Sequence, residues 1–420
     1  MKTKDIIRRT LRKPGKQRGA VLVLFSLALV GLLLGSGLVV DLGSAYVSRS
    51  NLSKGVDAGA LAGARYAGRD EAELKAMIEN MALANYSRGA PVDYDIKVEH
   101  PGIDTTKGTV AGTTRYDTIF ARLAGIDSLA MAASAEAIRY PLDMTLILDL
   151  SGSLQQNGVF DDMQRAATAF VDHFDEKVDQ IGLITYSTWA VEHVKALKNT
   201  KSTIKTKINA FSAITDTNID EGLRLGKTNL DNAAARTNAI KVAVLFTDGR
   251  PTAFANTIQM PSTHNPKTYN GIVAAYTTGS SYRGLFQISD GRKITKFVSG
   301  APQLTSNSST TASTPTPAKL PSGKSVSGAN IRAEGITEAE YWATEMRKSG
   351  YLIFSIALGN PGSSDPLAQP DLDFLRRVAN EKGIVNAAEP KGELMYAPTA
   401  AQLDAMFNKV ADRILTRLTR

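Results

Sequence analysis

The sequence contains no cysteine, so a disulfide framework, a thiolate metal site and a cysteine nucleophile are all excluded. It has only four histidines (His100, His173, His193 and His264), and no two of them stand at the spacing of a zinc motif. There is also no G-x-S-x-G nucleophile elbow and no phosphate-binding P-loop. We therefore expect neither a zinc site nor an enzyme.

Negative charge is scarce at the N-terminus, where residues 1–18 hold eight basic side chains and a single acid, Asp5. Eight minus one gives this tail +7 of the net charge of +8, which leaves +1 for the remaining residues. A surface that binds nucleic acid needs its basic residues on the folded part of the chain. The basicity belongs to a tail, so the sequence predicts no nucleic-acid binding.

Charge is absent from residues 20–40, a run of 21 apolar or small residues. About 20 such residues suffice for a helix to cross a membrane. We expect a transmembrane helix over residues 19–41, with residues 1–18 in the cytoplasm and the rest of the chain on the other side, because basic residues stay inside. A cleaved signal peptide is the alternative, but the run is long and the small residues at 43–45 make a poor cleavage site.

The residues after the membrane segment change character twice before residue 140. Residues 44–86 are rich in alanine and predict a helix that continues the membrane helix outward. Residues 93–138 alternate between apolar and polar side chains, which is typical of strands, with a short helical piece at 118–126. We expect this helix and a small α+β stalk to occupy residues 42–140.

From residue 141 apolar strands alternate with helices, which predicts an α/β fold with a doubly wound, mainly parallel sheet over residues 141–420. Strands are expected at 144–150, 180–187, 239–248 and 351–359. Helices are expected at 161–174, 200–212, from 218, 337–348, 371–381 and 399–418. Capping boxes predict where two of these helices begin, at Thr337 with Glu340 and at Thr399 with Gln402.

One connection in this pattern, residues 250–330, is much longer than a compact domain needs. Its later part, residues 299–328, is rich in Ser, Thr, Pro and Gly and is predicted to be disordered. The earlier part, residues 250–298, contains several aromatic residues and is expected to form a small insertion at the edge of the sheet.

Oxygen-bearing side chains follow the expected strands. DLSGS places Asp149, Ser151 and Ser153 at the end of the first strand, LFTDG places Asp248 at the end of the third, and DTNID supplies Thr217 before a helix. Carboxyl ends of parallel strands meet at the ligand-binding edge of such sheets, and hard divalent cations prefer oxygen ligands. Only two of these five side chains are acidic, so a bound divalent cation would keep an unfilled site that can attract a partner's carboxylate. Helix capping is the alternative for DLSGS alone.

DLSGS, DTNID and FTDG, in this order, resemble the metal-ion-dependent adhesion site of von Willebrand factor A domains. The resemblance covers roughly 143–250 and 330–420. It implies that Asp149, Ser151 and Ser153 ligate or support Mg²⁺, that Thr217 adds a hydroxyl, and that Asp248 acts directly or through water. Mn²⁺ and Ca²⁺ are alternative ions, and Ca²⁺ is favoured by Asp216, which stands where the family usually has a small residue.

Two residues near the expected metal edge, Asp216 and Trp189, are candidates for binding a partner. Trp189 and Tyr186 follow the second strand, where an exposed aromatic side chain would anchor a protein partner. Packing in the core is the alternative for both aromatic residues.

The N-terminal part is similar to the corresponding segment of TadE/TadG-like proteins of Flp (tight adherence) pilus assembly. The shared features are a basic start, one membrane helix, Asp-Leu-Gly after it, and Asp57 before an alanine-rich stretch. The order of the expected parts, a membrane anchor followed by a stalk and a C-terminal A domain, resembles the domain layout of TadG. Leu24 stands fifth after Gly19, where prepilin-type processing requires a glutamate, so such cleavage is not expected.

These resemblances imply a non-enzymatic pilus assembly or adhesion protein of the bacterial inner membrane. Its A domain would face the periplasm or the exterior and bind a protein partner, such as a component of the Tad secretion machinery or the pilus, that offers a carboxylate to the metal. A cell-envelope scaffold or adhesin unrelated to pili is the alternative. A chelatase-type A domain that serves a cytoplasmic ATPase would need the opposite topology.

Overall fold

The computed structural model describes residues 18–86, 90–236, 238–276, 281–304, 314–359 and 370–418. The chain divides into two compact units. The first unit consists of Met1–Gly63, Glu71–Val98 and Gly108–Glu136, and the second consists of Ala64–Asp70, Glu99–Lys107 and Ala137–Arg420. The basic tail predicted for residues 1–18 lies outside the described residues except for Arg18.

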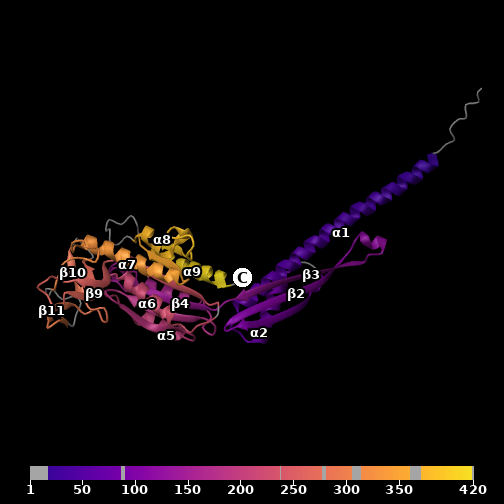
Figure 1. Cartoon of the computed structure of the whole chain (residues 1–420). Coiled ribbons are helices and arrows are strands. Elements are labelled where there is room, and N and C mark those ends of the chain that lie inside the picture. Colours follow the sequence, from indigo (N-terminus) through magenta and orange to yellow (C-terminus); the bar gives the residue numbers. More distant parts are fainter. Residues whose placement is uncertain are drawn as a thin grey trace, which may run out of the picture. The chain divides into compact units, whose positions relative to one another are not determined.

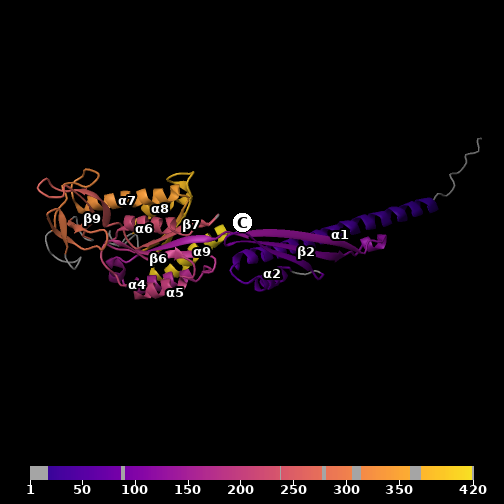
Figure 2. The same cartoon turned by 60° about the horizontal axis from the view of Figure 1, so that its bottom comes forward.

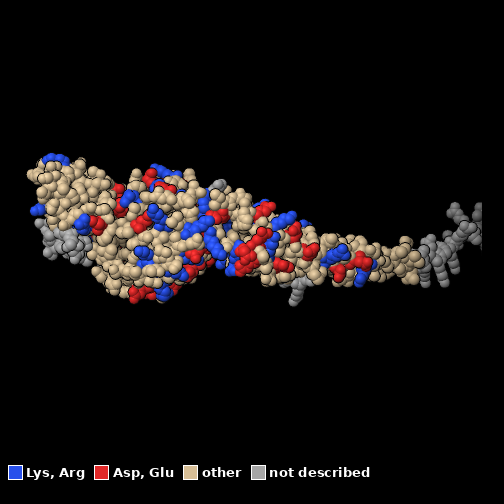
Figure 3. Space-filling view, turned by 90° about the horizontal axis from the view of Figure 1, so that it is seen from below, with Lys and Arg blue, Asp and Glu red and all other residues tan. Residues whose placement is uncertain are grey.

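The first unit is dominated by one uninterrupted helix, α1 (Arg18–Arg65), of 48 residues (Figure 1). At 1.5 Å per residue this helix is about 72 Å long. Its N-terminal part is long and apolar enough to cross a membrane, and most of its large apolar side chains from Val21 to Val40 are exposed. Figure 3 shows that this end of α1 bears no charged side chain on the face in view.

The later half of α1 packs against a second helix, α2 (Glu71–Asn85), through a row of glycines. A Cβ atom added at Gly55 would lie 2.9 Å from the carbonyl oxygen of Ala82, and one at Gly63 would lie 2.8 Å from Ile78 Cδ1. The helices therefore approach too closely for larger side chains. The single helix expected over residues 44–86 is broken at residues 66–70, where the chain turns to bring α2 back along α1.

A three-stranded sheet of order β1-β2-β3 completes the stalk, as the alternating pattern predicted. Its strands are β1 (Asp93–Gly102), β2 (Thr105–Asp117) and β3 (Ser128–Arg139). The short helical piece expected between the last two strands is the 3-10 helix η1 (Ala121–Ala124). Leu52 and Val56 of α1 lie next to Gly112 of β2, where an added Cβ would come within 3.1 Å of both side chains.

The second unit contains a six-stranded sheet of order β14-β13-β7-β4-β5-β6. Its strands are β4 (Leu142–Asp149), β5 (Gln180–Tyr186), β6 (Ala190–Leu197), β7 (Ile240–Thr247), β13 (Leu352–Leu358) and β14 (Glu393–Ala397). All neighbouring pairs are parallel except β5 with the edge strand β6. Every residue of β4 and β5 is buried, as expected of strands that are covered on both faces.

Helices cover both faces of this sheet (Figures 1 and 2), so the predicted doubly wound α/β fold is confirmed. One face packs on α4 (Phe160–Val171), α5 (Lys201–Ala210) and α9 (Leu403–Leu418). The other face packs on α6 (Ile219–Asp231), α7 (Gly328–Lys348) and α8 (Leu372–Ala379). Leu146 and Leu148 of β4 belong to the first core and Ile147 to the second, which is the alternation that a strand requires.

The long connection between β7 and α7 folds into strands of its own. They are β8 (Ala253–Gln259), β9 (Thr268–Ala275) and β10 (Tyr282–Phe286), which form one antiparallel sheet, and β11 (Ile294–Val298) and β12 (Ala301–Leu304), which form a hairpin. We call residues 250–327 the insertion. Its own apolar cluster includes Phe254, Val273 and Leu285.

Two sequence predictions about this region were wrong. Disorder was expected over residues 299–328, yet β12 lies there and Leu320 is buried with the apolar cluster of the insertion; residues 305–313 are outside the described part. Helix α7 begins nine residues before Thr337, at Gly328, and its N-cap is Ser327, whose hydroxyl accepts a hydrogen bond from the Asn330 N–H. Thr337 instead donates to the Ala333 carbonyl within the helix, as threonines in helices can.

The second predicted capping box does not form, because the Thr399 side chain makes no hydrogen bond to the backbone. Thr399 precedes a short 3-10 turn, η3 (Ala400–Gln402), and makes no side-chain cap. Its hydroxyl contacts the Gln402 side chain at 3.3 Å, and the α-helix itself begins at Leu403.

Candidate functional site

The candidate metal site is built around Asp149, the last residue of β4, whose side chain is fully buried. Its Oδ1 atom accepts the backbone N–H of Ser151 at 2.7 Å. Its Oδ2 atom accepts the hydroxyls of Thr247 at 2.8 Å and Tyr186 at 3.2 Å, from the ends of the two neighbouring strands. The carboxylate is therefore fixed in place by its own turn and by both adjacent strands.

Asp248 approaches the serines of the DLSGS turn from the end of β7, as the sequence predicted. Its Oδ1 atom lies 2.8 Å from the Ser153 hydroxyl and 3.4 Å from the Ser151 hydroxyl, and the two hydroxyls are 3.0 Å apart. Its Oδ2 atom is buried and accepts no hydrogen bond from the described residues. One carboxylate oxygen at this edge of the sheet thus has no partner.

The loop that carries Thr217 is held beside the DLSGS turn by the backbone. The Ile214 N–H donates to the Leu150 carbonyl at 2.7 Å, and the Gly152 N–H donates to the Thr215 carbonyl at 3.0 Å. Thr217 itself is buried, and its N–H donates to the Thr252 hydroxyl at 2.9 Å. The three segments that the sequence singled out therefore meet at one edge of the sheet.

The electrostatics of this edge disfavour two ionised carboxylates. Burial raises the pKa of Asp149, against the lowering effect of its hydrogen bonds. Burial raises the pKa of Asp248 as well, and the nearby charge of Asp149 raises it further. Because like charges in a low-dielectric site repel each other, a cation between them would stabilise both ionised forms.

The donor set fits a hard divalent cation. It offers the carboxylates of Asp149 and Asp248 and the hydroxyls of Ser151 and Ser153, and Asp248 Oδ2 has no partner among the described residues. Thr217 lies on the loop that is bonded to this turn. In the described part of the chain no group of three or more His, Cys, Asp and Glu side chains could hold a metal.

The two residues predicted to bind a partner have other contacts in the structure. Asp216 is buried, accepts the Thr188 hydroxyl at 2.7 Å, and forms an ion pair with Arg283 of the insertion. Its charge is thereby compensated, which removes the basis for expecting tighter metal binding or a preference for Ca²⁺. Trp189 is half-buried and packs against the apolar cluster of the insertion that includes Phe286.

Sequence reasoning missed the roles of three residues that shape this site, including Tyr186, whose side chain is buried and does not anchor a partner. Thr247 and Tyr186 orient Asp149, and Arg283 neutralises Asp216. Thr247 had a visible signal, because it directly precedes Asp248 at the same strand end. Arg283 had none, since it lies 67 positions from Asp216 in a segment with no recognised motif.

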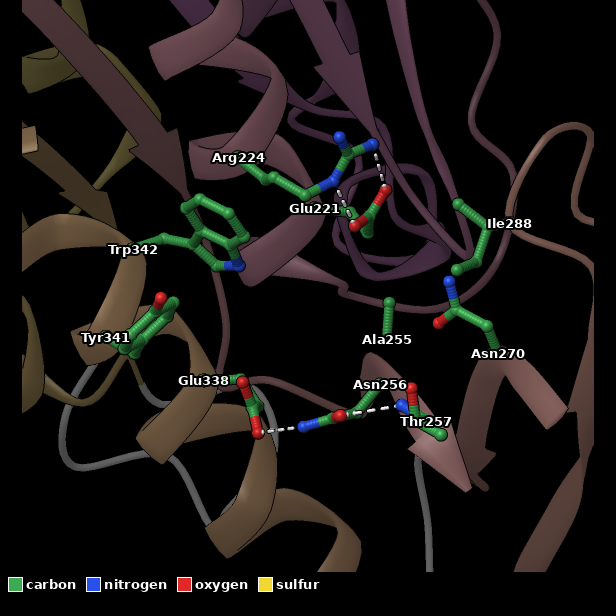
Figure 4. A pocket seen from close by; sticks show the side chains of 10 residues that line it. All are labelled: Glu221, Arg224, Ala255, Asn256, Thr257, Asn270, Ile288, Glu338, Tyr341 and Trp342. Carbon is green, nitrogen blue, oxygen red and sulfur yellow. Dashed lines mark hydrogen bonds and ion pairs between the residues drawn. The ribbon is translucent and has the colours of Figure 1, made fainter. Parts of the chain in front are cut away.

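A separate cavity of about 680 Å³ lies between α6, α7 and the insertion (Figure 4). Its walls include Glu221, Arg224, Asn256, Glu338 and Trp342, and none of the five predicted metal ligands lines it. Arg224 donates to Glu221 at 2.6 and 2.9 Å, and Asn256 donates to Glu338, so its charged and amide groups are largely satisfied among themselves. The cavity is therefore distinct from the candidate metal site.

Two protein families match the sequence. Residues 143–311 match the von Willebrand factor type A domain, and residues 19–65 match the family described as putative Flp pilus-assembly TadE/G-like. No curated protein sequence matches the chain significantly.

Several solved structures are distantly similar to the chain. The von Willebrand factor domain of the type V pili tip protein Mfa5 from Porphyromonas gingivalis is 17% identical, with a TM-score of 0.43, and the match covers 67% of this chain and 97% of that one. The pilus adhesin SpaC from Lactobacillus rhamnosus GG is 14% identical, with a TM-score of 0.41 and coverages of 79% and 34%. The PilB minor pilin from Streptococcus sanguinis is 16% identical, with a TM-score of 0.41 and coverages of 78% and 79%.

The sheet order, the two helical layers and the family match together define the second unit as built on a von Willebrand factor type A domain. With the TadE/G-like segment at its N-terminus, the chain has the make-up of a TadG-like protein that carries such a domain.

Proposed function

We propose that this chain is a membrane-anchored, non-enzymatic protein of Flp pilus assembly or adhesion, whose A domain binds a protein partner through a divalent cation. The observation that carries the proposal is the buried pair of Asp149 and Asp248 beside the serine hydroxyls, with Asp248 Oδ2 lacking a partner among the described residues. The TadE/G-like segment supports the pilus context.

The chain's own residues would hold Mg²⁺, or alternatively Mn²⁺ or Ca²⁺, at this edge. Asp149, Ser151, Ser153, Thr217 and Asp248 supply the oxygen atoms, and Thr247 and Tyr186 keep Asp149 oriented. When bound, the ion would offer an unfilled coordination position to a carboxylate, because its two acidic ligands do no more than balance its charge and the hydroxyl ligands are neutral. A partner from the Tad secretion machinery or the pilus that presents an Asp or Glu would fit this chemistry.

The contacts of the candidate nucleophiles support a binding role over a hydrolytic one. Ser151 and Ser153 contact each other and Asp248, and no histidine of the described residues is among their partners. Two histidines of the A domain outside the insertion contact other side chains, with His173 beside Asn408 at 2.8 Å and His193 beside Thr185 at 2.8 Å. A serine without a general base is a weak nucleophile.

The membrane arrangement in this proposal follows from the N-terminal charge. Residues 20–40 would span the bacterial inner membrane once, with the basic residues 1–18 in the cytoplasm. The A domain would then lie in the periplasm or beyond, where it can meet a pilus or envelope partner.

Metal binding is tested on the full chain in detergent micelles, stripped of metal with EDTA and titrated with Mg²⁺, Mn²⁺ or Ca²⁺. A ligand that binds only the native state at a hundred times its Kd adds about 2.7 kcal/mol of stability, so the melting temperature should rise. Asp149→Ala and Ser151→Ala should abolish this rise. Ser151→Ala keeps both carboxylates, so a lost response in this variant still tests metal binding if Asp149→Ala fails to fold.

Asp290→Ala is the matched control, because Asp290 is an exposed acid of the insertion that pairs with Arg292. It should melt like the wild type and keep the full response to metal. If the wild type shows no rise with any of the three ions, or if Ser151→Ala responds as the wild type does, the metal-dependent function is refuted.

A further inference from the structure

The loop between β2 and β3 ends in four exposed apolar side chains, which we call the apolar tip. They are Leu123, Ile119, Ile126 and Phe120, with exposed fractions of 77%, 63%, 46% and 38%. A loop that faces water normally carries Gly, Asn, Asp or Ser at such positions. A contiguous group of large apolar side chains at a loop end points to a contact with an apolar phase or partner.

The apolar tip is fixed against the membrane segment of α1 by Asp41. The Asp41 carboxylate accepts three backbone N–H groups of the loop, from Ile119 at 2.8 Å, from Phe120 at 2.8 Å and from Ala121 at 2.7 Å. Phe120 also lies on Gly37 of α1, where an added Cβ would come within 2.6 Å of the phenylalanine ring. Both views of the fold show the loop beside α1 (Figures 1 and 2).

The loop contacts α1 at Gly37 and Asp41, so the apolar tip lies at the border of the expected membrane span. Gly37 is inside the charge-free run of residues 20–40, and Asp41 directly follows it. The Asp41 side chain is fully buried, so α1 shows no charge there. Its exposed apolar surface continues past Asp41 through Leu42, Tyr46 and Val47.

The loop is also built to hold its shape. The Ile126 N–H donates to the Ala121 carbonyl at 3.1 Å, and Gly125 adopts a φ of +84° that only glycine takes easily. Arg122 pairs with Asp127 at 3.2 Å on the exposed side. An ion pair of this kind is tolerated among lipid headgroups but not in the hydrocarbon core, which limits how deep the apolar tip can lie.

We propose that the apolar tip inserts into the interfacial layer of the bilayer that holds α1, on the side of the stalk, as a second membrane contact. The inference rests on the proposed membrane anchor and adds a lipid-binding surface to it. The bilayer is favoured over a protein partner as the occupant, because the apolar tip lies level with residues 37–41, where α1 itself exposes apolar surface. A folded loop held at that level meets the lipid without any rearrangement.

The native absence of cysteine makes a direct test possible. Full-length Leu123→Cys is labelled with bimane and reconstituted into phosphatidylcholine–phosphatidylglycerol vesicles that contain lipids with a nitroxide near the headgroup or near the chain end. Ile103→Cys is the matched control, because Ile103 is 63% exposed in the turn at the opposite end of β2. Val30→Cys, in the middle of the charge-free run, reports on the anchor itself.

Shallow nitroxide lipids should lower the emission of labelled Leu123→Cys about two-fold, as expected for an apolar side chain in the interfacial layer. They should leave labelled Ile103→Cys unchanged, while deep nitroxide lipids should quench labelled Val30→Cys. If Val30→Cys is quenched and Leu123→Cys behaves like Ile103→Cys, the tip contact is refuted and the anchor stands. If Val30→Cys is not quenched either, the anchor fails, and the tip proposal fails with it.

Discussion

The ion pair of Asp216 and Arg283 joins the insertion to the loop of the metal site, beside the hydrogen bonds between Thr217 and Thr252. Both side chains are nearly buried, with 5% and 9% exposed, and Thr188 adds a hydrogen bond to the carboxylate. Burial raises the pKa of Asp216, and the charge of Arg283 counteracts that rise. Removing one partner of this buried pair should lower the stability of the fold strongly, because the charge of the remaining partner stays buried and cannot be solvated.

Arg283→Met should therefore lower the free energy of unfolding by about 3 kcal/mol or more. The measurement is urea unfolding of the full chain in detergent with EDTA present, so that metal binding does not contribute. Arg292→Met is the control: Arg292 forms an exposed pair with Asp290, and such pairs contribute about 0–1 kcal/mol.

Adding Asp216→Asn to Arg283→Met should restore part of the lost stability, since the stranded charge is then removed. Equal effects of Arg283→Met and Arg292→Met would show that the buried pair does not stabilise the insertion.

At the residue scale, the sequence was enough to predict the positions of candidate ligands that directly follow recognisable strands. It was not enough to predict contacts between segments that are distant in the chain. Asp149 and Asp248 end continuous apolar strands, so their meeting at one edge could be predicted from the parallel sheet. The pairing of Asp216 with Arg283 depends on how the insertion folds, and the capture of the 119–121 backbone by Asp41 depends on the stalk. Neither has a local pattern.

The contact between α1 and α2 makes a prediction at the scale of elements. Alanine favours a helix over glycine by about 0.8–1 kcal/mol, so Gly→Ala normally stabilises an exposed helix position. At Gly55 the new Cβ would lie 2.9 Å from the Ala82 carbonyl, and such overpacking costs about 1–3 kcal/mol. Gly55→Ala should therefore destabilise the stalk, despite the better helix propensity.

Gly43→Ala is the matched control on the same helix, because nothing lies within 4 Å of the Cβ it would add. It should leave the melting temperature unchanged or raise it, while Gly55→Ala lowers it, in thermal melts of the full chain followed by circular dichroism. If both variants shift the melting temperature in the same direction, the close approach of the two helices is not needed for stability.

Element boundaries show why composition alone misleads. The composition of residues 299–328 predicts disorder because apolar residues are few there. Those few are nevertheless used: Leu320 is buried in the core of the insertion, and Leu304 and Val326 pack against that core. The Tyr282 hydroxyl also donates to the Pro315 carbonyl at 2.8 Å. Helix α7 starts at Gly328 and not at Thr337, because the Ser327 hydroxyl caps it by accepting the Asn330 N–H.

At the scale of the whole molecule, the charge distribution predicts the topology. Because residues 1–18 carry +7 and the following 21 residues no charge, the C-terminus should lie outside the cytoplasm. Alkaline phosphatase fused after Arg420 should then be active in cells, since this reporter folds only outside the cytoplasm. A well-expressed but inactive fusion would contradict the orientation.

A variant of the same fusion in which Arg8, Arg9, Arg12 and Lys13 become glutamine serves as its comparison. It removes four of the eight basic residues of the tail and should lower the phosphatase activity per molecule, because the bias that retains the tail in the cytoplasm is weaker.

The three hydrogen bonds that cover Asp41 have a consequence for biosynthesis. Their donors lie 78 to 80 positions later in the chain. In the proposed topology, Asp41 is therefore a bare charge at the outer limit of the anchor while the protein is being made and exported. Only after the stalk strands have crossed the membrane and folded would that charge be buried and the border of the anchor be complete. In that topology the stalk would complete the outer border of the anchor from outside the cytoplasm, late in biosynthesis.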